Sequence, residues 1–181
     1  MLVFRYEDLA MYDKVLLLQQ RALEIKEKVL GKEHPDISES LINLSHTYSL
    51  IAQYDRALPL QHRALEINEK VLGQDHPSTA MSLISLAHTY SKLAQYDKAR
   101  PLQQRALEIN EKALGPLHRD TAKSLNNLAA TYFYLAQYDK ALLLQQRVVE
   151  IAEKTLGKEH PDTASSLNNL AVIYIKLAQY Q

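Results

Sequence analysis

Residues 124–157, SLNNLAATYFYLAQYDKALLLQQRVVEIAEKTLG, decide the fold, because the rest of the chain repeats them. A shift of 42 residues superimposes Tyr54, Tyr96 and Tyr138. The same shift superimposes a set of glycines and a set of histidines, which are Gly31, Gly73, Gly115, Gly157, His34, His76, His118 and His160. A fixed period of this length is typical of stacked helical repeats.

Each period predicts two helices. One is expected at 13–30, 55–72, 97–114 and 139–156, where apolar residues recur three and four positions apart. The other is expected at about 36–51, 78–93, 120–135 and 162–178, with a buried stripe of Leu41, Leu44, Tyr48 and their equivalents. The first type ends at a glycine, which readily takes the left-handed conformation beyond a helix. The sequence therefore predicts an all-α stack of antiparallel helix pairs, none of which can bury its apolar face alone.

The expected organisation is a single stack over residues 1–181. A partial repeat covers 1–31, three repeats cover about 34–73, 76–115 and 118–157, and an unpaired helix covers about 160–181. Residues 1–11 resemble the end of the helix at 36–51, so they are expected to form a separate stub of a preceding helix. Both ends then present uncovered apolar faces, which predict end-to-end self-association.

The composition narrows the possible partners. Lysine plus arginine equals aspartate plus glutamate, at 21 each, so the chain has no net positive field to attract nucleic acid. No apolar run approaches the roughly 20 residues of a membrane helix. The chain has no cysteine, and its first residues, MLVFRYEDLA, carry acidic groups where a secretion signal would be apolar. We therefore expect a cytoplasmic protein that binds neither nucleic acid nor membrane.

The sequence contains none of the common catalytic or phosphate-binding motifs. The four repeated histidines cannot share one zinc ion at about 2 Å, because stacked repeats hold equivalent positions far apart. Their place before each helix predicts a local role, either capping free N–H groups or packing on the neighbouring turn. No enzyme activity, metal or cofactor is predicted.

The combination of Leu-x-x-Leu-Ala-x-x-Tyr, Tyr-Asp-x-Ala and Arg-Ala-Leu-Glu-Ile resembles a tetratricopeptide repeat (TPR). The 42-residue unit, with LNNLA at 125–129 and 167–171 and GKEHPDTA at 157–164, is similar to the repeats of kinesin light chains and of many bacterial proteins. The resemblance covers essentially the whole chain. It implies a right-handed superhelix with a concave groove for peptides or partner segments. The first helix of each repeat, at about 36–51 and its equivalents, lines this groove.

The repeats differ from one another mainly on one face of the second type of helix. Their spacing places these positions away from the Leu/Tyr stripe, on the face that the resemblance assigns to the groove. The candidate binding residues are Glu39, Ile42, His46, Leu50, Met81, Ile84, His88, Lys92, Lys123, Asn126, Phe133, Tyr134, Asn168, Val172, Ile175 and Lys176. Drift of an exposed surface is the alternative, but many of these residues are apolar, and apolar patches usually mark interaction sites.

The chemistry of this face predicts the kind of ligand. Lysines outnumber acidic groups on it, and the amides of Asn126 and Asn168 can bond a peptide backbone in both directions. We therefore expect a non-catalytic interaction module for an extended segment with apolar or aromatic side chains and some acid. His46 and His88 occupy equivalent positions, and their protonation near pH 6 would favour an acidic ligand.

Two alternatives remain open. The chain could be the sensor or scaffold part of a larger effector. The copies are also similar enough to be a recently duplicated or consensus-like array without a specific ligand.

Overall fold

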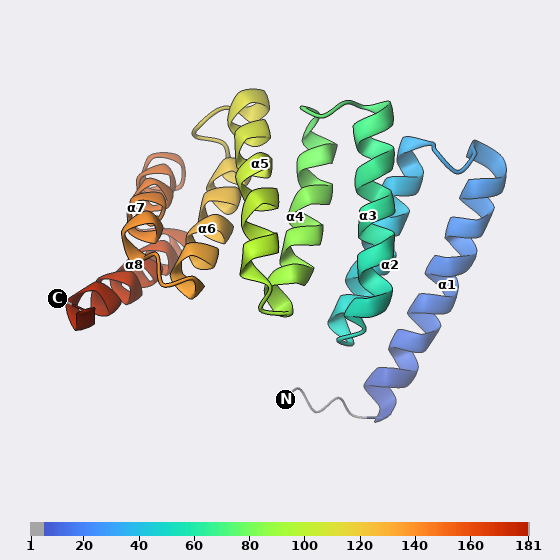
Figure 1. Cartoon of the computed structure of the whole chain (residues 1–181), viewed down its shortest axis with the longest axis horizontal. Coiled ribbons are helices and arrows are strands. Elements are labelled where there is room, and N and C mark those ends of the chain that lie inside the picture. Colours follow the sequence, from blue (N-terminus) through green and yellow to red (C-terminus); the bar gives the residue numbers. More distant parts are fainter. Residues whose placement is uncertain (1–5, 181) are drawn as a thin grey trace. The chain divides into compact units, whose positions relative to one another are not determined.

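The computed structural model describes residues 6–180, which form eight α-helices joined by short connectors (Figure 1). Contacts divide the chain into two compact units, one ending at Leu93 and the other beginning at Ala94. Unit 1 contains α1 (Tyr6–Leu30), α2 (Pro35–Leu50), α3 (Tyr54–Val71) and α4 (Pro77–Lys92). Unit 2 contains α5 (Tyr96–Leu114), α6 (Arg119–Tyr134), α7 (Tyr138–Thr155) and α8 (Pro161–Tyr180). The predicted all-α fold of sequential helix pairs is confirmed.

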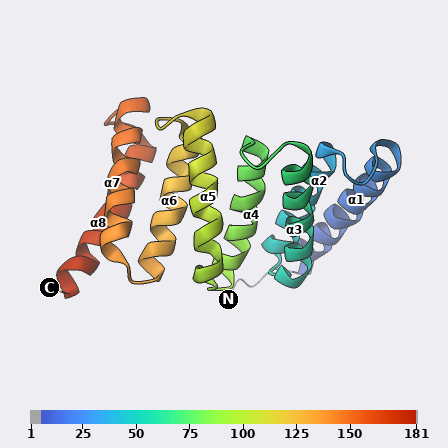
Figure 2. The same cartoon turned by 45° about the horizontal axis from the view of Figure 1, so that its top comes forward.

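In unit 1, consecutive helices pack side by side, and both views show them running in alternating directions (Figures 1 and 2). The predicted stripe of α2 is buried, with Leu41 fully inaccessible and Tyr48 nearly so. It forms one core with residues of the two flanking helices, which are Leu16, Leu23, Ala57, Ala64 and Ile67. Complete burial of each large apolar side chain stabilises the fold by roughly 1.5–3 kcal/mol.

Unit 2 repeats this packing. Leu125 and Leu128 of α6 lie in a core with Leu107 of α5 and with Val148 and Ile151 of α7. α8 packs on the other side of α7 and contributes the buried Ile173. The same repeat positions therefore form the core of both units.

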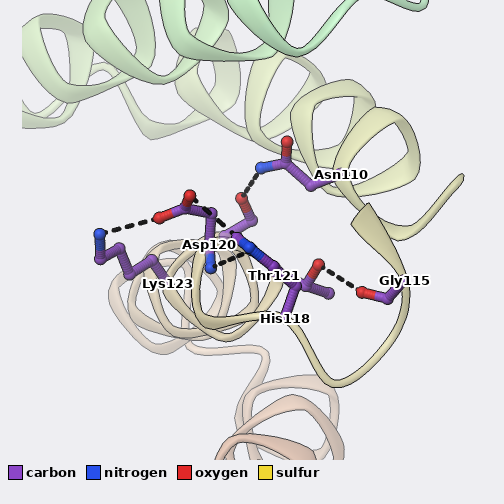
Figure 3. A network of polar contacts seen from close by, with 7 residues as sticks. Asn110, Gly115, His118, Asp120, Thr121 and Lys123 are labelled. Atoms are coloured by element: carbon purple, nitrogen blue, oxygen red, sulfur yellow. Dashed lines mark hydrogen bonds and ion pairs between the residues drawn. The ribbon is translucent and has the colours of Figure 1, made fainter. Parts of the chain in front are cut away.

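The connectors are held by the repeated histidines. In each one, the histidine Nδ1 atom accepts a hydrogen bond from the backbone N–H two residues later, at 3.0–3.2 Å. The preceding glycines all have positive φ, between 89° and 100°. In the later connectors a threonine hydroxyl also donates to the glycine carbonyl, as Thr121 does to Gly115 at 2.8 Å (Figure 3). The expected capping role of the histidines is confirmed.

The two ends of the described chain differ from the sequence-based expectation. The prediction of a separate helical stub within residues 1–11 is wrong. α1 runs without a break from Tyr6 to Leu30, through the position near residue 12 where the stub was expected to end. Residues 1–5 lie outside the described part of the chain. α8 runs to Tyr180, through the position at which the internal helices of its type end in a turn. At the equivalent internal positions, Ala52, Ala94 and Ala136 reverse the chain with φ of 55–58°. This conformation costs an alanine roughly 1–2 kcal/mol, which packing between the two helices joined by the turn can offset.

Candidate functional site

The predicted binding residues of α6 lie on its accessible side. Lys123 and Tyr134 are exposed and Asn126 and Phe133 are half-buried, whereas Leu125 is fully buried. The 3.6-residue period of the helix separates the two sets, because it turns every third or fourth side chain to the same side. This side of α6 faces a hollow in unit 2.

The hollow consists of two adjoining cavities that are lined by residues of α6, α7 and α8 and of their connectors. The smaller, of about 310 Å³, is lined by Asn126, Ala129, Ala130, Phe133, Tyr134, Gln145, Asn169, Val172 and Ile173. The larger, of about 540 Å³, is lined by Leu117, His118, Arg119, Ala122, Lys123, Asn126, Asn127, Val148, Ile151, Ala152, Thr155, Leu156, Asp162, Ser165, Ser166 and Asn169. The two cavities share Asn126 and Asn169, and together we name them the α6–α8 groove.

Two asparagine side chains meet at the middle of the groove. Asn169 Nδ2 of α8 donates to Asn126 Oδ1 of α6 at 3.2 Å. This bond does not use Asn126 Nδ2 or Asn169 Oδ1, so the pair offers one donor group and one acceptor to a ligand. An extended backbone presents the matching groups.

Sequence reasoning selected Asn168 on α8, whereas the structure lines the groove with Asn169. Asn168 is exposed and does not line either cavity of the groove. It is the repeat equivalent of Asn126, which lines the side of α6 that faces α8. A groove between two repeats is lined by the side of one helix that faces the next repeat and by the side of the second helix that faces the previous repeat. The LNNLA motif carries asparagine at both positions, which is the signal that could have found Asn169.

Aromatic rings line one end of the groove. The Phe133 and Tyr138 ring centroids lie 5.4 Å apart, edge to face. Tyr134 stacks on Tyr96, with centroids 4.9 Å apart and planes at 7°. Tyr134 nevertheless remains 64% exposed. The other repeats have Ser49–Leu50, Ser91–Lys92 and Ile175–Lys176 at these two positions, so this aromatic cluster is a feature of the third repeat.

Charged side chains lie at the other end. Arg119, Lys123 and Asp162 line the larger cavity. Lys123 Nζ also lies 2.8 Å from Asp120 Oδ1 (Figure 3). This hydrogen bond, followed by the nearby positive charges, lowers the pKa of Asp120 below its ordinary value. Asp120 therefore remains ionised and offsets part of the Lys123 charge, so the positive character of this end is weaker than the sequence suggested.

The remaining candidates of unit 2 lie on α8 outside this lining, except Val172. Val172 lines the smaller cavity. Ile175 is exposed, and Lys176 Nζ donates to Gln179 Oε1 at 3.2 Å. The groove thus brings together Lys123, Asn126, Phe133, Tyr134 and Val172 from the predicted set.

In unit 1 the predicted residues lie on the accessible sides of α2 and α4. Ile42 and Ile84 are half-buried, and the others are exposed: Glu39, His46, Leu50, Met81, His88 and Lys92. Partial burial, the Lys92 ammonium and the His46 ring lower the pKa of His88 from its ordinary value of 6.5. His46 and His88 are therefore close enough to interact, and His88 takes up its proton at a lower pH than the sequence-based expectation assumed.

Sequence reasoning missed a series of amide side chains that are buried between neighbouring helices. Gln61 Nε2 donates to Thr89 Oγ1 at 2.9 Å, and Asn68 and Asn110 donate to Ser82 and Ser124 at 2.9 and 3.0 Å. These bonds join neighbouring helices inside each unit, so they belong to the scaffold. Their recurrence at 42-residue spacing was the available signal.

The described residues were also searched for membrane-spanning helices and for metal sites. Within residues 6–180, no helix is both long and apolar enough to cross a membrane. The same part of the chain has no group of three His, Cys, Asp or Glu side chains that could hold a metal ion.

Comparisons with known proteins agree with the architecture. The tetratricopeptide repeat model matches residues 6–61, 51–112, 85–154 and 120–181. The crystal structure of nearly identical TPR-like repeats from Podosopora anserina, provisionally assigned to a kinesin light chain, is 30% identical, with a TM-score of 0.82 and coverage of 97% of this chain and 83% of that chain. A search of curated proteins returns no match.

Two more distant structures share the fold. BtubC (BKLC) from P. vanneervenii is 23% identical, with a TM-score of 0.85 and coverage of 97% of this chain and 70% of that chain. A Rap protein complexed with Competence and Sporulation Factor is 18% identical, with a TM-score of 0.72 and coverage of 94% and 46%.

Proposed function

Since this chain belongs to the tetratricopeptide repeat family, we propose that it is a non-catalytic protein-interaction module whose α6–α8 groove binds an extended peptide segment. TPR arrays generally serve as binding scaffolds. The Rap protein complexed with Competence and Sporulation Factor is a chain of this fold with a bound partner. The ligand of the present chain follows from the chemistry of its own groove.

The observation that carries the proposal is the order of groups along the groove. Phe133 and Tyr134 line one end, and the Asn126–Asn169 pair lies in the middle. Two cations, Arg119 and Lys123, and one acid, Asp162, lie at the other end. An apolar or aromatic side chain of the ligand would pack on the rings, and its backbone would bond the two amides. An acidic side chain would lie near the cations, where a charge-assisted hydrogen bond contributes about 1.5–3 kcal/mol.

Selection from a library of random displayed peptides tests this proposal, because such a selection requires no known ligand. The enriched peptides are expected to carry an apolar or aromatic residue and an acidic residue separated along the chain. Their affinities are then measured by fluorescence anisotropy. Asn126→Ala removes hydrogen bonds to the ligand and is expected to weaken binding about fivefold or more.

Two further variants examine the ends of the groove. The double variant Phe133→Ser and Tyr134→Lys introduces the residues of the second repeat and should abolish the preference for aromatic peptides. Lys123→Glu should weaken acidic peptides more than tenfold, because it reverses a contacting charge. Leu143→Lys is the matched control, since Leu143 is an exposed apolar residue of α7 outside the groove lining.

The proposal fails if no peptides are enriched. It also fails if the groove variants, folded by circular dichroism, bind the selected peptides as tightly as the Leu143→Lys control does.

A further inference from the structure

Two helix faces of this chain are exposed although they carry core residues. On α8, Leu167 is 43% and Tyr174 is 48% exposed, whereas their equivalents on α2, Leu41 and Tyr48, are 0% and 4% exposed. On α1, Leu18 and Ile25 are 67% and 53% exposed. Two apolar faces of core composition are therefore uncovered, and both lie outside the α6–α8 groove.

The chain itself contains the interface that would cover them. In unit 1 the face of α2 that corresponds to the α8 face is covered by α3, through Ala64 and Ile67. In unit 2 the same face of α6 is covered by α7, through Val148 and Ile151. The 42-residue period places Ala22 and Ile25 of α1 at these same covering positions. The exposed α1 face is thus the counterpart of the exposed α8 face.

A cation–π contact with a tyrosine ring recurs at the internal interfaces that correspond to the two exposed faces. Arg56 of α3 lies over the Tyr48 ring of α2, 5.0 Å from its centroid. Lys140 of α7 lies over the Tyr132 ring of α6, at 5.4 Å. At the two exposed faces the equivalents are Lys14 and Tyr174, so the cation is retained on α1 and the ring on α8. Such a contact contributes about 0.5–1 kcal/mol at an exposed site.

The α8 ring is also held in position from its other side. Gln146 of α7 donates to the Tyr174 hydroxyl at 3.1 Å, as Gln20 of α1 donates to the Tyr48 hydroxyl at 2.8 Å. Tyr174 is therefore fixed by its inner neighbour in the same way as the buried Tyr48. Its outer side, the side on which Arg56 lies over Tyr48, is exposed in the described part of the chain.

We propose that a second copy of this chain covers the α8 face, with α1 of one molecule packed on α8 of the other as α3 packs on α2. Lys14 of the second copy then lies over Tyr174 of the first. The two faces are different, so the contact is head to tail. Each molecule added leaves another free α1 and another free α8 face, and association proceeds beyond a dimer.

One residue limits the strength of this contact. Val15 occupies the position of Ala57 and Ala141, both of which are fully buried. The larger side chain overfills the space that alanine occupies in the internal interfaces, and overpacking destabilises a contact. Association is therefore expected at high protein concentration, and Val15→Ala should shift it to lower concentration.

Two variants, each blocked at one face, test the proposal by sedimentation velocity. Leu18→Glu with Ile25→Glu blocks α1, and Leu167→Glu with Tyr174→Glu blocks α8; all four side chains are exposed, which favours retention of the fold. The unmodified chain should form species larger than a dimer as concentration rises. Each blocked variant alone should be monomeric, and their equimolar mixture should form a dimer and nothing larger, because only one matching pair of faces remains.

Leu17→Glu is the matched control, since Leu17 lies beside Leu18, is 66% exposed and belongs to the outer face of α1. It should associate like the unmodified chain. The proposal is overturned if the unmodified chain and Val15→Ala both remain monomeric at the highest concentration. It is equally overturned if a singly blocked variant still self-associates, or if the mixture of two folded blocked variants does not dimerise.

Discussion

Four histidines act as helix N-caps, a position that Ser, Thr, Asp or Asn usually occupies. Each places Nδ1 on a backbone N–H that would otherwise lack a partner, for example Asp120 N to His118 Nδ1 at 3.1 Å. Three of them precede a proline, which donates no hydrogen bond of its own. These side chains therefore have a structural role at each connector, as their place before each helix predicted.

Removal of one cap should lower stability measurably. His118→Ala is expected to reduce the free energy of unfolding by about 1 kcal/mol, because it leaves an N–H of α6 without its acceptor. Urea denaturation followed by circular dichroism measures the change. His118→Asn keeps an acceptor at this position and should restore most of the loss, and equal destabilisation by both variants would contradict the capping role.

His88 should make stability depend on pH. Its pKa in the folded chain is lowered from 6.5, first by partial burial and then by Lys92 and His46. As the pH falls through 6.5, the unfolded chain takes up the proton before the folded chain does, so the free energy of unfolding decreases. His88→Gln should therefore lose less stability than the unmodified chain between about pH 7.5 and 5. Identical pH profiles for the two proteins would show that His88 does not titrate differently in the folded state.

At the scale of elements, one short sequence takes two conformations. LAQY reverses the chain at 93–96 and 135–138 but continues the helix at 177–180. The glutamine at the start of the following helix makes no capping bond with its side chain in α5 or α7, so this residue does not impose the turn. The turn requires positive φ at alanine, and packing of the second helix of the pair supplies the compensating energy.

Glycine substitution should therefore have opposite effects at two alanines of unit 2. Ala136 has a φ of 56°, and Ala136→Gly is expected to raise the free energy of unfolding by up to about 1 kcal/mol, since glycine takes this conformation without strain. Ala130, also exposed, lies inside α6, and Ala130→Gly should lower stability by roughly 0.5–1 kcal/mol. Chemical denaturation of both variants gives the comparison, and destabilisation by Ala136→Gly would show that the turn is not strained.

At the scale of the whole molecule, stability depends on which repeat faces are covered. Leu125 and Leu167 are the same residue at the same repeat position, but Leu125 is fully buried and Leu167 is 43% exposed. The surface ion pairs between neighbouring repeats, such as Arg147 with Glu111, are partly exposed and contribute at most about 1 kcal/mol each. The covered apolar stripes therefore provide most of the stabilisation in each unit.

Matched leucine truncations measure this difference. Leu125→Ala should cost about 2–5 kcal/mol, because it leaves a cavity in the core of unit 2. Leu167→Ala should cost less than about 1.5 kcal/mol in dilute solution, because much of that side chain is already in water. Comparable losses for the two variants at low protein concentration would contradict the assignment of Leu167 to an uncovered face.

The sequence by itself determined the repeat period, the helices, the glycine and histidine connectors and the side of α6 that remains accessible, because local pattern and backbone chemistry fix all of them. Only the tertiary structure decided three further features. It joined residues 6–11 of the expected N-terminal stub to α1 and left LAQY helical in α8, because an alanine turn needs two helices that pack on each other to offset its cost. It selected Asn169 over Asn168 for the groove, because a site between repeats depends on which sides of two helices face each other.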